Sequence, residues 1–125
     1  MGLFSGFLGN ASEADISEVE RDLQAIMLDD EQVEHAYKLI RDLIVFTNRR
    51  MILVDKQGMT GKKTEYHSIP YKSITHFSIE TAGHFDLDAE LKIWISSMHN
   101  PITKEFRKDD SIFSIQKALV MYTTK

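Results

Sequence analysis

The 125-residue sequence contains no cysteine and no long apolar run. Without cysteine the chain has no disulfide, no thiolate metal site and no cysteine nucleophile, and a reducing compartment is compatible with it. No stretch approaches the roughly 20 apolar residues that a membrane-spanning helix needs. The apolar stretch over 1–10 lacks the basic start of a secretory signal peptide, and Gly6 stands where a myristoylation signal needs Ser or Thr. The sequence therefore predicts a cytoplasmic protein.

An excess of basic residues is also absent. The chain has 15 Lys and Arg against 19 Asp and Glu, a formal net charge of −4. Because nucleic-acid binding depends on clustered Lys and Arg, this balance argues against a nucleic-acid partner. It also weakens the case for broad attraction to an anionic membrane. With 42% hydrophobic and 27% charged residues, the composition is that of an ordinary globular protein of one domain.

Catalytic signatures are missing as well. The sequence has no Ser-centred nucleophile elbow and no His-Glu-x-x-His pair on a helix, and Gly58 and Gly61 lack the spacing of a phosphate loop. The five histidines are scattered over predicted strands and turns: His35, His67, His76, His84 and His99. We therefore predict that the protein is not an enzyme and holds no cofactor.

What the sequence does contain is a series of short β-branched and aromatic segments separated by Asn, Asp and Gly, which predicts an antiparallel meander. The predicted strands, all within 32–108, span 33–40, 43–47, 50–55, 62–67, 73–81, 85–97 and 102–107. A helix over 12–28 precedes them, capped by Ser12 or Asp15, with an apolar stripe at Ile16, Val19, Leu23 and Ile26. A second helix over 109–123, capped by Asp109 or Asp110, places Ile112, Ile115, Leu119 and Tyr122 on one face. The prediction is a single mainly-β domain over 12–125, with an apolar, Gly-rich arm over 1–11.

The second and third strands are apolar on both faces, over 43–46 and 51–54. A sheet with one wet face alternates instead, so these strands need a cover on their outer side, either the first helix or another subunit. The apolar arm and Trp94 also suggest contacts between subunits, because Trp is enriched at interfaces. The residues predicted for an oligomer interface are Phe4, Phe7, Ile44, Phe46, Ile52, Val54 and Trp94.

The sixth strand places a polar row opposite its apolar row. Asp86, Asp88 and Glu90 lie in this row, and His76, Ser78 and Glu80 on the fifth strand would add ligands if the register matched. Same-face residues along a strand lie roughly 6.5–7 Å apart, too far for one ion to bind more than about two of them. We predict no metal site and interpret the row as a solvated or interfacial face.

Two small basic clusters, at Arg49–Arg50 and at Lys62–Lys63, allow an alternative function. Such residues hold phosphorylated headgroups through charge-assisted hydrogen bonds, although turns and sheet edges also favour them for solubility. The candidate residues for an anionic ligand are Lys38, Arg41, Arg49, Arg50, Lys62 and Lys63.

Four motifs resemble the bacterial pleckstrin-homology (PH) domain family. They are Arg41-Asp-x-Ile44-Val-Phe-Thr-Asn-x-Arg50, Val54-Asp-Lys-Gln-Gly58-x-Thr-Gly-Lys-Lys63, Ile69-Pro-Tyr-Lys-Ser-Ile74 and Glu80-Thr-Ala-Gly-His-Phe-Asp-Leu-Asp-Ala-Glu90-Leu. The resemblance covers about residues 12–123 and implies a PH-like split barrel of seven antiparallel strands, capped by a C-terminal α-helix and extended by an N-terminal helix. It also implies a non-catalytic binding module similar to ring-forming homo-oligomers. The basic pattern of lipid-binding relatives is reduced here to Lys38 and Arg41 beside Asp42.

These observations predict a PH-like module that binds copies of itself and serves as a scaffold for an unknown protein partner. The copies would form a ring if the contact between them is of the kind that closes. The alternative is a module that binds anionic phospholipid or a phosphate ligand at a membrane surface.

Overall fold

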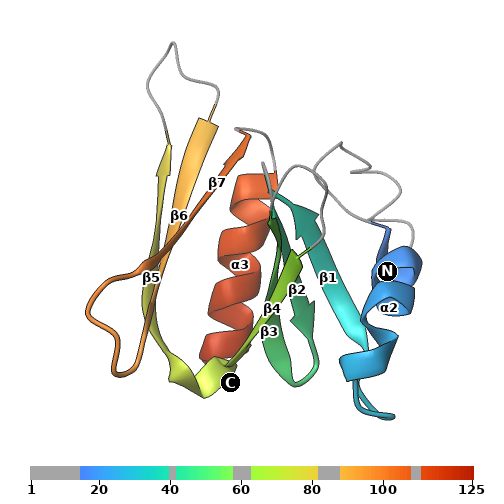
Figure 1. Ribbon diagram of the computed structural model, residues 1–125. Coiled ribbons are helices and arrows are strands. Elements are labelled where there is room, and N and C mark those ends of the chain that lie inside the picture. The colour runs from blue at the N-terminus through green and yellow to red at the C-terminus, as the bar shows by residue number, and fades with distance from the viewer. Residues whose placement is uncertain (1–14, 40–41, 58–62, 82–87, 108–110) are drawn as a thin grey trace.

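The computed structural model describes residues 15–39, 42–57, 63–81, 88–107 and 111–125. Two antiparallel sheets form the body of the molecule (Figure 1). The first sheet has the order β1-β2-β3-β4, from β1 (Val33–Lys38), β2 (Asp42–Thr47), β3 (Arg50–Gln57) and β4 (Lys63–Pro70). The second has the order β5-β6-β7, from β5 (Ile74–Thr81), β6 (Asp88–Ile95) and β7 (Ile102–Arg107). A short helix, η2 (Tyr71–Ser73), joins the two sheets.

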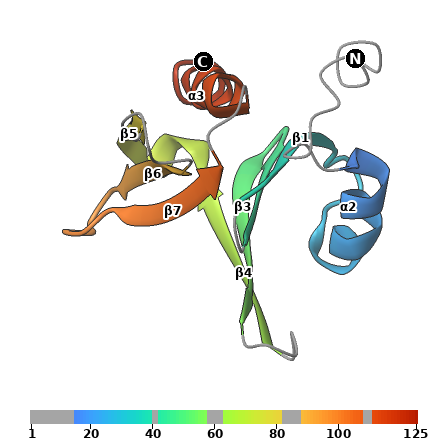
Figure 2. The same ribbon diagram turned by 90° about the horizontal axis from the view of Figure 1, so that it is seen from above.

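The C-terminal helix α3 (Ser111–Thr123) lies over the opening between the two sheets (Figure 2). Its predicted apolar face is confirmed, because Ile112, Ile115, Leu119 and Tyr122 are all buried in the main core. Phe46 of β2 and Phe106 of β7 are fully buried in the same core. An ion pair of 2.9 Å between Lys104 of β7 and Asp42 of β2 also joins the sheets. The predicted fold class, a mainly-β split barrel closed by a C-terminal helix, is confirmed.

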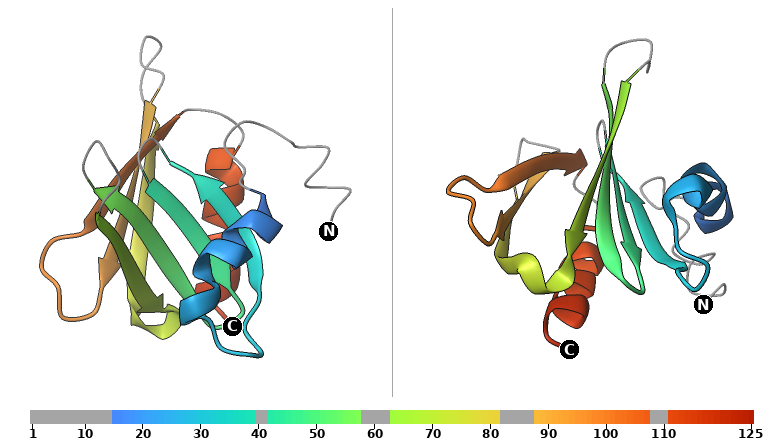
Figure 3. Two further views of the ribbon diagram at one scale, coloured as in Figure 1. Left: turned by 45° about the vertical axis from the view of Figure 1, so that its right-hand side comes forward. Right: turned by 60° about the horizontal axis from the view of Figure 1, so that its bottom comes forward.

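The N-terminal helix α2 (Ile16–Leu23), continued by η1 (Gln24–Ile26), covers the other face of the first sheet (Figure 3). A second apolar cluster lies beneath it, made by Val19 and Leu23 of the helix and by Val33, Ala36, Val45, Ile52 and Val54 of the sheet. The two-faced apolar pattern of β2 and β3 is thus explained within one chain, since one face packs on α3 and the other on α2.

The observed first helix is shorter than the predicted one. Asp15 caps it as predicted, because its carboxylate accepts hydrogen bonds from the backbone N–H groups of Ser17 and Glu18. The α-helix ends at Leu23, and Ile26, which was predicted on the buried stripe, is 39% exposed. The cause lies further along, where Glu31 closes a tight turn by accepting from the Leu28 N–H while its own N–H donates to the Leu28 carbonyl. The other predicted caps, Ser12, Asp109 and Asp110, lie outside the described residues.

The strand bounds differ from the predictions in detail. β3 and β4 are longer than predicted, and Pro70 is the last residue of β4, paired with Arg50, rather than a residue beyond it. β1 has a register shift between Val33 and His35, so strict alternation fails there. In the part of the chain that the structure describes, no helix is long and apolar enough to cross a membrane.

Candidate functional site

The predicted basic cluster at the β2–β3 turn is occupied by the chain's own acidic residues. Arg49 forms a two-pronged ion pair with Asp30, and both side chains are about half exposed or more, at 48% and 65%. Arg50 donates to Glu31 from Nε at 2.8 Å and from Nη2 at 3.0 Å, and its other hydrogen bonds reach the Ile26 carbonyl and the Ser68 hydroxyl. Every nitrogen of the Arg50 guanidinium thus already has an acceptor within the chain, and its main role here is structural.

Glu31 is the centre of this network, and its side chain is fully buried. Besides Arg50, it accepts hydrogen bonds from the Thr47 hydroxyl at 2.6 Å and from the Leu28 N–H at 3.2 Å. Burial by itself would raise the pKa of Glu31, but the hydrogen bonds from Arg50, Thr47 and Leu28, with the charge of Arg50, outweigh it and lower the pKa to about 2. The Tyr71 hydroxyl lies 2.5 Å from the Thr47 carbonyl oxygen and 2.8 Å from that of Arg50, which fixes the same turn from the core side.

The lowered pKa of Glu31 predicts a specific loss of stability in acid. Because the folded-state pKa lies below the ordinary value of 4.5, the stabilisation is complete above pH 5 and is lost as the pH falls toward about 2. The shift corresponds to about 3 kcal/mol. Urea unfolding of the wild type and of Glu31→Gln between pH 7 and pH 2 measures it, and the difference between the two should shrink across this window. A difference that stays constant with pH would contradict the prediction.

The remaining anionic-ligand candidates are not gathered into one site by the described residues. Lys38 and Lys63 are exposed on separate strands, and Arg41 and Lys62 lie outside the described residues. A cavity of about 240 Å³ between α2 and the first sheet includes Lys38 and Lys56 in its wall, but its polar lining also has four carboxylates, from Asp15, Glu18, Asp22 and Asp42. Four carboxylates beside two ammonium groups suit a phosphate poorly, because like charges repel it.

Four of the predicted interface residues are core residues in this structure, which corrects their assignment to a free surface. Ile44 and Phe46 are buried in the main core, while Ile52 and Val54 are buried beneath α2. The sequence did not decide whether a helix of the same chain or another subunit covers the outer side of β2 and β3. In the structure, the first helix of the same chain covers it. Phe4 and Phe7 lie outside the described residues.

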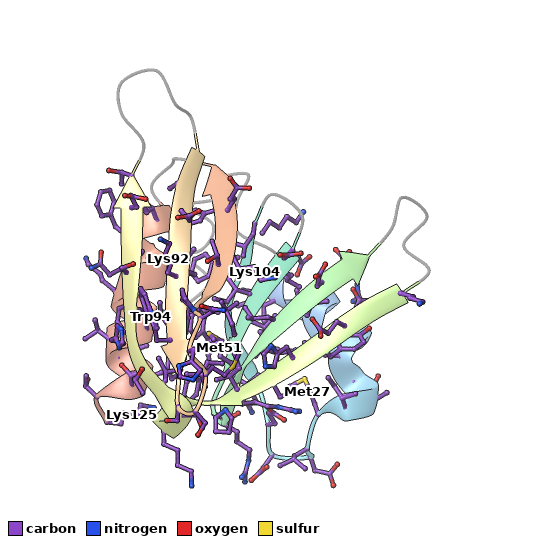
Figure 4. All side chains as sticks on the ribbon, turned by 60° about the vertical axis from the view of Figure 1, so that its left-hand side comes forward. Met27, Met51, Lys92, Trp94, Lys104 and Lys125 are labelled. Atoms are coloured by element: carbon purple, nitrogen blue, oxygen red, sulfur yellow. The ribbon has the colours of Figure 1, made fainter. Side chains whose placement is uncertain are left out.

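Trp94 lies on the outer face of the second sheet, where it is half-buried (Figure 4). Its ring stacks on His76 of the neighbouring strand, with centroids 4.4 Å apart and planes at 17°. The register places His76, Ser78 and Glu80 opposite Trp94, Lys92 and Glu90, so the polar rows of β5 and β6 do share a face. Among the described residues, no group of three His, Asp or Glu is arranged to hold a metal ion. Asp86 lies outside the described residues.

The outer face of α3 carries apolar residues that were not among the predicted site residues. Phe113 is 61% exposed, and Val120 and Met121 are each 46% exposed. These positions fall at i, i+7 and i+8, which places them together on one side of a helix, with Lys117 between them. The signal was present in the sequence, since the helix is apolar on the side opposite its buried face as well.

Known proteins resemble this chain in both sequence and fold. The profile of the bacterial PH domain family matches residues 2–123, nearly the full length of the chain. The chain belongs to the bacterial PH domain family. A crystal structure of a PH domain from Shewanella amazonensis SB2B superposes with a TM-score of 0.79 at 51% identity, covering 89% of this chain and 100% of that one.

Two further relatives agree with this assignment. A crystal structure of a DUF1696 family protein with a pleckstrin-homology domain, from Shewanella loihica PV-4, superposes with a TM-score of 0.78 at 54% identity, covering 91% of this chain and 97% of that one. The uncharacterised protein YjqA of Bacillus subtilis (strain 168) is 62% identical over 120 residues, which cover 95% of this bacterial PH domain and 96% of YjqA. The family resemblance predicted from the four motifs is confirmed.

Proposed function

We propose that this bacterial PH domain is a non-catalytic, cytoplasmic binding module that assembles with copies of itself into a scaffold for protein interactions. The observation that carries the proposal is the outer face of α3, where Phe113, Val120 and Met121 are exposed on one side of the helix, around Lys117. Such patches on a folded domain mark interaction surfaces, because leaving them in water is unfavourable. The internal pairing of Arg49 with Asp30 and of Arg50 with Glu31 favours this proposal over an anionic ligand at the β2–β3 turn.

Sedimentation velocity of the wild type and of Phe113→Asp tests this function. The wild type should sediment faster than a 14.4 kDa monomer, and the variant should sediment as the monomer, since a carboxylate cannot be buried unpaired at the contact. Tyr66→Asp is the matched control, because Tyr66 is an exposed aromatic on β4 and is paired with Val54, whose side chain packs beneath α2 and not in the core under α3. Equal sedimentation of the wild type and Phe113→Asp, with both folded by circular dichroism, would contradict the proposal.

A further inference from the structure

We propose that the cavity between α2 and the first sheet binds a small zwitterion with an apolar body, such as a free aliphatic amino acid. The cavity has a volume of about 240 Å³. Because pockets for drug-sized ligands usually hold roughly 300–1,000 Å³, this cavity suits a smaller molecule. The site is separate from the surface of the proposed function, since α2 and α3 lie on opposite faces of the first sheet (Figure 3).

The floor of the cavity is apolar and comes from both α2 and the sheet. Val19 of α2 and Val54 of β3 belong to the apolar cluster beneath α2, and Leu43 of β2 packs against it. Leu39, which follows β1, is buried as well and completes the floor. A hydrocarbon group that lies on this floor leaves water without losing a hydrogen bond, which favours an apolar ligand body.

The strand register places two lysines on the same face of the sheet as this floor. Lys38 is paired with Leu43, and Leu43 with Val54, so the three side chains form one row across β1, β2 and β3. Lys56 lies two residues beyond Val54 on β3 and therefore shares its face. Both lysines are exposed and line the cavity, so the sheet side of the cavity offers two ammonium groups.

The helix supplies carboxylates to the opposite wall. Glu18 and Asp22 lie four residues apart and thus on one side of α2, and both are exposed and line the cavity. None of the ion pairs between described residues includes either of these carboxylates or either lysine of the sheet wall. The two walls therefore carry opposite charges that do not neutralise each other by direct contact.

The other two carboxylates of the lining are already engaged within the chain. Asp42 pairs with Lys104 at 2.9 Å, and Asp15 accepts the backbone hydrogen bonds that begin α2. The groups left for a ligand are two carboxylates and two ammonium groups. A phosphate would be repelled by the carboxylates, and a polyamine by the lysines. A ligand with one ammonium group and one carboxylate complements both walls through charge-assisted hydrogen bonds.

L-Leucine is the probe for this site, because it has both charges and a branched hydrocarbon side chain. Its titration into isotope-labelled wild type should shift the backbone NMR signals of Val19, Leu43 and Val54 until they saturate. Isocaproate lacks the amino group of leucine, isoamylamine lacks the carboxylate, and glycine lacks the side chain. Each of the three should bind at least about tenfold more weakly than leucine, because each loses one of the contacts.

Two charge-removing variants test the walls separately. Asp22→Asn and Lys56→Gln should each weaken leucine binding at least about tenfold, since each removes one charged partner of the ligand. Asp29→Asn and Lys63→Gln are the matched controls, because both residues are exposed and neither is among the described residues that line the cavity. Both controls should bind leucine as the wild type does, and so should Phe113→Asp, which changes only the face of α3.

The absence of NMR shifts in the wild type at millimolar leucine would overturn the proposal, and so would shifts that cluster away from α2 and the first sheet. Isoamylamine binding as tightly as leucine would show a site for cations, and isocaproate doing so would show a site for anions. Either result overturns the zwitterion, as does unchanged leucine affinity in Asp22→Asn and Lys56→Gln. A wild type that is monomeric at every concentration and binds leucine as described would overturn the proposed function alone.

Discussion

Replacing Glu31 with alanine is expected to lower the free energy of unfolding by about 3–5 kcal/mol, the usual cost of removing one partner of a buried ion pair. The side chain is fully buried and accepts from Arg50, Thr47 and Leu28. Its loss leaves the Arg50 guanidinium and the buried Thr47 hydroxyl without this acceptor. The loop between α2 and β1 would lose its buried attachment to the β2–β3 turn and keep only the outer ones, which include the hydrogen bonds between Asn48 and Gln32 and the Arg49–Asp30 pair.

The neighbouring acidic residue provides the control for this experiment. Asp30 lies next to Glu31 in the loop between α2 and β1 and pairs with Arg49 of the β2–β3 turn, but both side chains are largely in water, so Asp30→Ala should change stability far less. Urea unfolding followed by Trp94 fluorescence and by circular dichroism measures both variants. If Asp30→Ala destabilises the protein as much as Glu31→Ala, the buried network is not what holds the loop.

Phe46→Ala is expected to lower the free energy of unfolding by a similar amount, about 3–5 kcal/mol, because it opens a cavity in the main core. The ring is fully buried, stacks on Tyr122 at 5.5 Å and meets Tyr37 edge to face at 6.2 Å. Its removal therefore loses both apolar burial and two aromatic contacts. Folded Phe46→Ala protein should still associate as the wild type does, since Phe46 lies inside the chain.

Phe113→Ala is the reciprocal variant, with the same chemical change on an exposed residue. Its free energy of unfolding, measured on dilute monomer, should stay within about 0.5 kcal/mol of the wild type, because surface truncations rarely do more. Its association should weaken. The structure would be contradicted if folded Phe46→Ala associated more weakly than the wild type while Phe113→Ala associated normally. That result would place Phe46 at the surface and Phe113 in the core.

Much of this fold could be predicted from the sequence, because its elements follow simple apolar periods. The buried face of α3 was readable from the spacing of Ile112, Ile115, Leu119 and Tyr122, all of which are buried. The apolar runs of β2 and β3 correctly indicated a cover on both faces. The pattern could not tell a helix of the same chain from another subunit, because both would present similar apolar side chains.

The roles of individual polar residues were harder to predict, because each depends on a partner distant in the sequence. From the sequence alone, Arg50 is interpreted as a free basic residue in a turn. Its partner Glu31 lies 19 positions earlier, and only the fold brings the two side chains together. The shift in register between Val33 and His35 was not predicted for a related reason. The alternating pattern of the sequence does not show where the pairing of two strands becomes irregular. The early end of α2 depends on the turn that Glu31 closes, which lies outside the helix itself.

The exposed face of α3 was not predicted, because the buried stripe alone is enough to account for an amphipathic helix. Apolar residues on the side of a helix opposite its buried face indicate a second contact surface, and Phe113 and Val120 are such residues here. The bacterial PH domain family gives the fold of this chain, while the exposed α3 face is the feature that suggests what the fold does.

Absolute mass in solution, measured by light scattering on a sizing column across a dilution series, tests the proposed self-association most directly. We expect a mass that is a stable multiple of 14.4 kDa at micromolar concentration and that falls toward the monomer only on strong dilution. A mass of 14.4 kDa at every concentration would contradict it and would leave the apolar face of α3 to a different partner.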